Sequence, residues 1–149
     1  MSAEENKALM RRVMEEIFNE GNLDLVDELF APDYVDHDPN MPEDVRGPEG
    51  FKEFVSAYRA SCADLHIEVE DQVAEGEKVT TCWTATCTHD GDLWGIPPTG
   101  NRVRVAGMEI SGIVGGKVAE TWGNYDVMGL MKQIGAIPSP EQPEEASPA

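Results

Sequence analysis

The sequence predicts an α+β domain built from a curved antiparallel β-sheet and helices packed on one of its faces. Three observations support this fold class: helical spacing of apolar residues before Asp64, apolar–polar alternation after it, and a short helical pattern that ends at Gly135. Helices and strands that are segregated along the chain are typical of α+β domains. A long twisted sheet covered by helices on one face tends to curl into an open cone, and the interior of that cone is a natural pocket.

Two helices are expected first. Residues 3–19 carry one apolar stripe at i, i+3 and i+4 spacing, which predicts an amphipathic helix. Gly21 is a suitable C-cap for it, and Asn22 is expected to cap a second, short helix. Pro32 ends that helix, so the chain up to this point should form two consecutive helices.

A short extended segment and a third helix follow. Tyr34 and Val35 predict a very short strand, and the prolines after it indicate a loop. Pro48 fits the first turn of the third helix, whose buried side is expected to be largely aromatic. The residues on that side are Phe51, Phe54, Val55 and Tyr58.

The second half of the chain predicts a meander of antiparallel strands. Leu65, Ile67 and Val69 alternate with polar residues, and the β-branched segments after them have strand character. A turn at residues 75–78, a loop at 91–101 and a hairpin at 114–117 are expected to separate the strands. The later strands are expected at residues 79–89, 102–114 and 118–126, and the final helix at 127–135.

The composition fits one acidic domain. The chain has 149 residues, a length typical of a single domain. The folded part is expected to cover residues 1–137, and the Pro- and Glu-rich segment at 138–149 is expected to be a flexible acidic tail. Lys and Arg number 11 against 29 Asp and Glu, which gives a formal net charge of −18. Such a surface repels phosphate groups, so neither nucleic acid nor a membrane is an expected partner.

The three cysteines, Cys62, Cys82 and Cys87, include no CxxC pair. Their odd number argues against a disulfide framework, and each is expected to be a small apolar residue. Cys82 and Cys87 should point to opposite faces of their strand. The N-terminus has no secretory pattern and no apolar run is long enough to span a membrane, so the expected location is the cytoplasm.

Two stretches carry a family pattern: THDGDLWGIPPTGNRVRVAGMEI at residues 88–110, and GGKVAETWGNYDVMGLMKQIGAIP at 115–138. Their G-x-P-P-T-G loop, and the G-K-x-x-E-x-W-x-x-x-D segment that leads into a helix ending Q-x-G, resemble the SnoaL-like polyketide cyclase family of the NTF2-like superfamily. The stretch ADLHIEVEDQVAEGEKV also fits the second strand of that family. The resemblance extends from about Asn6 to Pro138.

The resemblance implies an NTF2-like cone and a small-molecule enzyme that needs neither a metal nor an organic cofactor. Cyclases of this kind close a ring by intramolecular aldol condensation, and the residue that matches Asp126 is their acid/base. A basic side chain on the preceding strand often accompanies it, and this chain has Gly112 there. NTF2-like proteins commonly pair through the outer face of the sheet, where Arg102 and Arg104 are expected, so a homodimer is expected as well.

Asp126 lies where the last strand gives way to the final helix, and two interpretations are open. It can cap the helix by accepting a hydrogen bond from a backbone N–H of the first turn. It can also be a carboxylate whose pKa is raised by an apolar pocket, which suits general acid/base catalysis. Strand alternation puts Trp122 and Asn124 on the same face as Asp126, so all three are candidates for one wall of the pocket.

His37 follows the short strand and has acidic neighbours in the sequence, Asp33, Asp36 and Asp38. It is either an exposed loop histidine or an acid/base at the mouth of the pocket, where these neighbours favour the imidazolium. A metal site is not expected, because adjacent residues cannot easily converge on one ion. The expected pocket residues are Tyr34, Phe18, Phe54, Tyr58, Trp83, Met108, Trp122 and Asn124, beside the catalytic candidates Asp126 and His37.

The leading interpretation is a cofactor-independent enzyme that uses acid/base chemistry to cyclise or isomerise a hydrophobic, oxygenated, polyketide-like small molecule. A different reaction on the same fold, such as epoxide hydrolysis or ketosteroid-type isomerisation, is one alternative. A small-molecule-binding protein without catalysis is another. These classes differ in whether loss of the Asp126 carboxylate abolishes turnover or leaves ligand binding intact.

Overall fold

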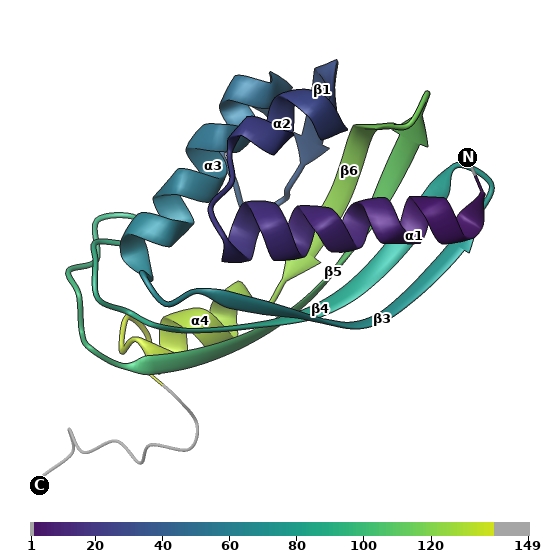
Figure 1. The fold of residues 1–149 in the computed structure, drawn as a ribbon. Helices are drawn as coiled ribbons and strands as arrows, with labels where there is room; N and C mark the ends of the chain where they lie inside the picture. Colours follow the sequence, from purple (N-terminus) through teal and green to yellow (C-terminus); the bar gives the residue numbers. More distant parts are fainter. Residues whose placement is uncertain (1, 139–149) are drawn as a thin grey trace, which may run out of the picture.

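The computed structural model describes residues 2–138, and its elements follow the α+β order expected from the sequence (Figure 1). The helices are α1 (Ala3–Arg12), α2 (Asp24–Leu29), α3 (Gly47–Ser61) and α4 (Val127–Gln133), with a π-helical segment, η1 (Val13–Asn19), continuing α1. The strands are β1 (Phe30–His37), β2 (Val45–Arg46), β3 (His66–Glu75), β4 (Lys78–Thr88), β5 (Arg102–Val114) and β6 (Lys117–Tyr125).

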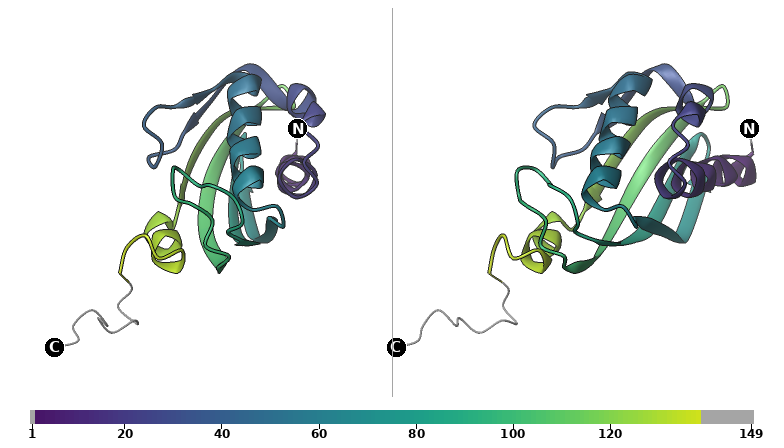
Figure 2. Two further views of the ribbon diagram at one scale, coloured as in Figure 1. Left: turned by 90° about the vertical axis from the view of Figure 1, so that its left-hand side faces the viewer. Right: turned by 60° about the vertical axis from the view of Figure 1, so that its left-hand side comes forward.

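All six strands belong to one curved sheet in the order β2-β1-β6-β5-β4-β3. Neighbouring strands are antiparallel except β1 and β6, which run parallel. Helices α1 and α3 lie on the same, concave side of the sheet (Figures 1 and 2). The α+β fold with a curved sheet covered by N-terminal helices is therefore confirmed.

Two clusters of buried apolar side chains hold the helices to the sheet. One cluster joins the N-terminal helices to β1 and α3, and Ile17, Val26 and Val55 are among its fully buried members. The other lies where α4 meets β5 and includes Val105 and Leu130. Residues from both clusters line the cavity described below.

Strand β1 is longer than the two residues expected. It extends over Phe30–His37 because it pairs in parallel with β6, a partner distant in the sequence that no local pattern reveals. Tyr34 and Asp36 on this strand and Asp38 directly after it are buried, and the residues between them are more exposed. Alternation therefore turns these three side chains inward and His37 outward.

Strand β6 contains a β-bulge near its start. Its pairing with β5 shifts between Gly112, which lies opposite Glu120, and Ile113, which lies opposite Val118. Val118 and Thr121 are both buried, although unbroken alternation would turn one of them outward. After the bulge, the side chains that the sequence predicted to face inward face outward, and their neighbours face inward.

A disulfide joins Cys62 and Cys87, which corrects the expectation of unpaired cysteines. The end of α3 meets the end of β4, and the two Cα atoms lie 5.6 Å apart. The two residues are 25 apart in the sequence, so no local pattern indicates the pairing. Cys82 is free and Cys87 lines the cavity, as expected for opposite faces of β4. The cysteines therefore give no support to a cytoplasmic location.

The expected tail at 138–149 lies, apart from Pro138, outside the described residues. A single domain ending at residue 137 stays a prediction. No helix within residues 2–138 is long and apolar enough to cross a membrane.

Candidate active site

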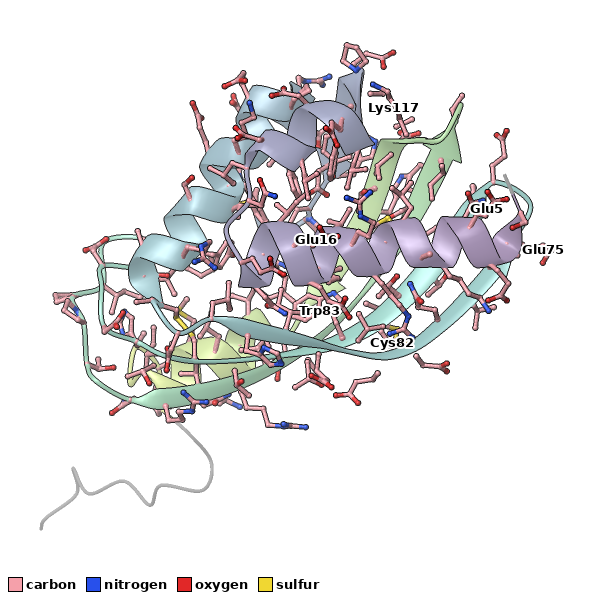
Figure 3. The ribbon with its side chains drawn as sticks, in the orientation of Figure 1. Glu5, Glu16, Glu75, Cys82, Trp83 and Lys117 are labelled. Carbon is pink, nitrogen blue, oxygen red and sulfur yellow. A yellow bond between two sulfur atoms is a disulfide. The ribbon has the colours of Figure 1, made fainter. Side chains whose placement is uncertain are left out.

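A cavity of about 120 Å³ lies between the concave face of the sheet and the N-terminal helices. Three carboxyl groups, those of Asp36, Asp38 and Glu109, interrupt its mainly apolar wall. Its aromatic residues are Phe18, Phe30, Tyr34, Phe51, Phe54, Tyr58, Trp83 and Tyr125. Trp83 projects from the middle of β4 (Figure 3). A mainly apolar cavity with a few polar groups suits a small, hydrophobic ligand.

Part of the expected pocket lines this cavity, namely Tyr34, Phe18, Phe54, Tyr58, Trp83, Met108 and Asn124. Two of these have side chains directed mainly to solvent. Met108 is 61% exposed. Asn124 is also exposed, and its Oδ1 accepts a hydrogen bond from Asn40 Nδ2 at 3.1 Å. The aromatic residues therefore supply most of the expected ligand contact.

Trp122, His37 and Asp126 do not line the cavity, so the expectation that Trp122 and Asp126 form one wall of it is wrong. The bulge in β6 is the reason, because it reverses the alternation before these residues are reached. The residues of this segment that line the cavity through the inner face are Thr121, Gly123 and Tyr125. Trp122 stacks on His37 on the outer face, with ring centroids 5.6 Å apart.

Asp126 is the N-cap of α4. Its Oδ1 accepts a hydrogen bond from the backbone N–H of Gly129 at 2.8 Å, and its side chain is exposed. The capping interpretation is thus confirmed. The carboxylate is held at the start of the helix, away from the cavity.

His37 links two strands and a loop on the outer face. Its Nε2 lies 2.6 Å from Glu120 Oε2, and its Nδ1 lies 3.2 Å from Asp44 Oδ2. The hydrogen bond to Glu120 is the main cause that raises the pKa of His37; desolvation opposes it, and the charge of Asp44 adds to the rise. The arrangement makes His37 a structural link between β1, β6 and the loop before β2.

Glu109 faces the cavity from β5, on the inner face that it shares with Val105. Burial, followed by the negative charge of Asp36, raises the pKa of Glu109 to about 8. Within residues 2–138 no hydrogen bond or ion pair engages its carboxyl group. A cavity-facing acid without a protein partner is available to a ligand.

Asp36 is a second cavity carboxyl with an altered pKa. It is 7% exposed, and burial, followed by the charge of Asp38, raises its pKa to about 7. Asp38 is equally buried, and its Oδ1 accepts a hydrogen bond from the backbone N–H of Asn40 at 2.8 Å. With pKa values of about 7 and about 8, Asp36 and Glu109 do not both ionise fully near neutral pH, so these two carboxyls retain a proton there.

The sequence interpretation missed Glu109, Asp36 and Asp38 as functional residues, although a usable signal was present. Alternation from Tyr34 along β1 places both aspartates inside, and alternation from Val105 along β5 does the same for Glu109. Gly112, where the resemblance suggested a basic partner, does not line the cavity. In the described part of the chain, no cluster of three or more His, Cys, Asp or Glu side chains is placed to hold a metal ion.

Known proteins with similar sequences share one family pattern. The sequence pattern of the SnoaL-like polyketide cyclases matches residues 8–134. Aklanonic acid methyl ester cyclase DnrD of Streptomyces peucetius is 31% identical over 140 residues, which cover 89% of this chain and 93% of that protein. Aklanonic acid methyl ester cyclase DauD of Streptomyces sp. strain C5 is also 31% identical, with coverage of 89% and 84%.

Solved structures share the fold. A protein of Jannaschia sp. CCS1, assigned to the SnoaL-like polyketide cyclases, has a TM-score of 0.83 and 25% identity, covering 91% of this chain and 95% of its own. TsrD of Streptomyces laurentii has a TM-score of 0.82 and 30% identity, with coverage of 92% and 99%. AclR of Streptomyces galilaeus, assigned as a hydroxylase, has a TM-score of 0.81 and 29% identity, with coverage of 93% and 85%. Because proteins that share this fold are assigned to different reactions, the reaction of this chain must be argued from its site.

Proposed function

Because the chain belongs to the SnoaL-like polyketide cyclase family, we propose that it is a cofactor-independent enzyme in which Glu109 and Asp36 perform acid/base catalysis. The substrate is a hydrophobic, polyketide-like molecule, and the reaction is ring closure by intramolecular aldol condensation or a related isomerisation. The observation that carries this proposal is the Glu109 carboxyl, which faces the cavity with a raised pKa and no protein partner among residues 2–138.

The two acids together can hold one proton near neutral pH. Burial, followed by the charge of Asp38, raises the pKa of Asp36 to about 7, and burial, followed by the charge of Asp36, raises that of Glu109 to about 8. Such a pair titrates as a unit, with one member ionised before the other. It therefore offers a carboxylate that can accept a proton and a carboxylic acid that can donate one.

Ring closure uses both forms. The carboxylate removes a proton from a carbon next to a substrate carbonyl, and the C–H electron pair forms the C=C bond of an enolate. The enolate carbon then attacks a second carbonyl of the same molecule, and the resulting alkoxide takes a proton from the carboxylic acid. No redox partner is needed, and the aromatic wall holds the flexible chain in a reactive conformation.

Proton abstraction can be measured without knowledge of the natural substrate. In D₂O, the wild type should accelerate exchange of the α-protons of an aryl β-keto ester, followed by NMR. Glu109→Gln and Asp36→Asn should each reduce the enzyme-dependent rate by about 100-fold or more. Undiminished exchange in both variants would contradict the proposed acid/base pair.

Ligand binding without catalysis is the competing function, and the same assay separates the two. A binding protein would hold the keto ester with no acceleration of exchange by the wild type. Epoxide hydrolysis with a cavity arginine receives no support, because no arginine lines the cavity in the described residues and Arg102 and Arg104 are exposed.

We also propose that the protein forms a homodimer through the outer face of the sheet. Exposed apolar side chains gather there on β3, β5 and β6, and contiguous patches of this kind mark interaction sites. They are Val73, Met108, Ile110 and Trp122. A Met108→Glu, Ile110→Lys variant should be monomeric by light scattering, and a monomeric wild type would contradict the proposal.

A further inference from the structure

Two tyrosines meet in the wall of the cavity. Tyr58 comes from α3 and Tyr125 from β6, and their hydroxyl oxygens lie in hydrogen-bonding contact. Both residues are half-buried and line the cavity. Their rings are fixed by aromatic neighbours, since Phe54 lies 5.0 Å from Tyr58 and Trp83 lies 6.1 Å from Tyr125, between ring centroids. The pair is therefore a positioned polar group on an apolar wall.

The pair retains an unused donor. Each hydroxyl carries one O–H, and one of the two O–H groups is enough to make the contact between them. No other side-chain hydrogen bond is formed by either hydroxyl within residues 2–138. Burial raises the pKa of Tyr125 to about 12 and that of Tyr58 further, so both phenols keep their protons near neutral pH. A second O–H is therefore free to donate to a ligand.

The sheet register relates Tyr125 of this pair to the cavity acid Glu109. Glu109 pairs with Gly123, and Tyr125 pairs with Gly107, so the two side chains are diagonal neighbours on the inner face. Diagonal neighbours across antiparallel strands lie roughly 7–8 Å apart, with their Cβ atoms somewhat closer. Neither glycine adds a side chain of its own, and the indole of Trp83 lies over Gly107 beside Tyr125.

Resting on the function proposed above, we propose that Tyr58 and Tyr125 form an oxygen-binding subsite for a planar aryl ketone or β-keto aryl substrate. The free O–H donates to the ketone oxygen, and the α-carbon of the ketone lies toward Glu109. As the α-proton leaves, the C–H electron pair becomes the C=C bond and the C=O electrons move to oxygen. The tyrosine hydroxyl stabilises that enolate oxygen, where negative charge develops.

Trp94 packs against Tyr58, one member of this pair. Its ring meets Tyr58 edge to face, with centroids 6.1 Å apart. Its backbone has a φ of 51°, a left-handed conformation that is costly for a residue other than glycine. The fold keeps this conformation with the indole packed against the Tyr58 ring, which helps to position that tyrosine.

The subsite can be tested with toluene and p-cresol, which differ by one hydroxyl group, by titration calorimetry. A buried ligand hydroxyl without a partner costs affinity, whereas one that meets a donor does not. The wild type should therefore bind p-cresol at least as tightly as toluene. In Tyr58→Phe/Tyr125→Phe, the affinity for p-cresol relative to toluene should fall about tenfold. The single variants should show part of the effect if the double variant does not fold.

Tyr34→Phe is the matched control, because Tyr34 lines the same cavity but its hydroxyl is near Thr121. It should leave the ratio of the two affinities unchanged. An unchanged ratio in the tyrosine-pair variants, or a wild type that binds neither compound, overturns the inference.

Glu109→Gln separates this inference from the function on which it rests. It should abolish α-proton exchange while leaving the p-cresol to toluene ratio within twofold of the wild type. If proton exchange depends on Glu109 but the affinity ratio is unchanged in the tyrosine variants, only the subsite proposal is wrong. If the affinity ratio depends on the tyrosines but proton exchange is unchanged in Glu109→Gln, the acid/base proposal is wrong and the oxygen-binding subsite is supported.

Discussion

Glu109 on β5 lies directly opposite Gly123 on β6, so no side chain from β6 stands between its carboxyl and the cavity. A Cβ atom at position 123 would lie 3.3 Å from the Cβ of Glu109, closer than ordinary van der Waals contact. The glycine thus leaves the acid accessible from the cavity. A buried acid without a partner destabilises the folded protein, which argues that the Glu109 carboxyl serves a ligand.

Stability should fall as the pH rises through the titration of this acid. The pKa of Glu109 is about 8 in the folded protein, well above the ordinary value of about 4.3 expected in the unfolded chain. Between these pH values the folded protein keeps a proton on Glu109 that the unfolded chain has released. The stabilisation that results from this difference is full below the lower pKa and is lost as the pH rises through the higher pKa.

Urea denaturation from pH 5 to 9 measures this effect. Glu109→Gln should flatten the decline of the free energy of unfolding with pH. At pH 9 the variant should be more stable than the wild type by on the order of 2 kcal/mol. This is less than the full pKa shift implies, because one side of the carboxyl faces the cavity. An equally steep decline in both proteins would show that Glu109 does not titrate in this range.

Gly107 should not tolerate a side chain. A Cβ at this position would overlap the indole of Trp83, which lies across the glycine. We expect Gly107→Ala to lower the free energy of unfolding by about 1–3 kcal/mol. Gly112→Ala on the same strand is the control, since its Cβ would meet only the backbone oxygen of Glu120 at 3.8 Å. Equal effects of the two substitutions would contradict the placement of Trp83.

The Cys62–Cys87 disulfide should contribute to stability. Thiol titration of the denatured, non-reduced protein should find one free thiol per chain, that of Cys82. Replacing both bonded cysteines by serine should cost about 2–4 kcal/mol. Cys82→Ser should have little effect and should keep the sensitivity to reductant. Three titratable thiols in the purified, non-reduced protein would show that the bond does not form.

Asp126 should act on the stability of α4. Asp126→Ala removes the acceptor for the Gly129 N–H and should cost about 1 kcal/mol. Asp126→Asn keeps an acceptor oxygen and should lie within a few tenths of a kcal/mol of the wild type. Thermal unfolding of the two variants distinguishes a capping acceptor from a residue whose charge matters to the fold.

Local patterns in the sequence predicted most elements of the fold. The period-two segments became β3, β4, β5 and β6, and Pro48 stands at the start of α3 as expected. The second helix begins one residue after Leu23, its N-cap, and not after Asn22. The length of β1 and the Cys62–Cys87 bond could not be read locally, because each depends on a partner far along the chain.

The site was less predictable because one inserted residue changes the direction of every later side chain. Alternation from Val118 points to Trp122 and Asp126, whereas the bulge turns Thr121 and Tyr125 inward instead. No turn residue marks that bulge in the sequence. The acid on β5 lies on a strand without such a shift before it, so alternation from Val105 would have found Glu109.

The central claim is that Glu109, and not Asp126, carries the acid/base chemistry. The direct test compares α-proton exchange of an aryl β-keto ester in D₂O by the wild type, Glu109→Gln and Asp126→Asn under identical conditions. We predict a loss of about 100-fold or more for Glu109→Gln and a rate within about twofold of the wild type for Asp126→Asn. A large loss in Asp126→Asn together with full activity in Glu109→Gln would contradict the account.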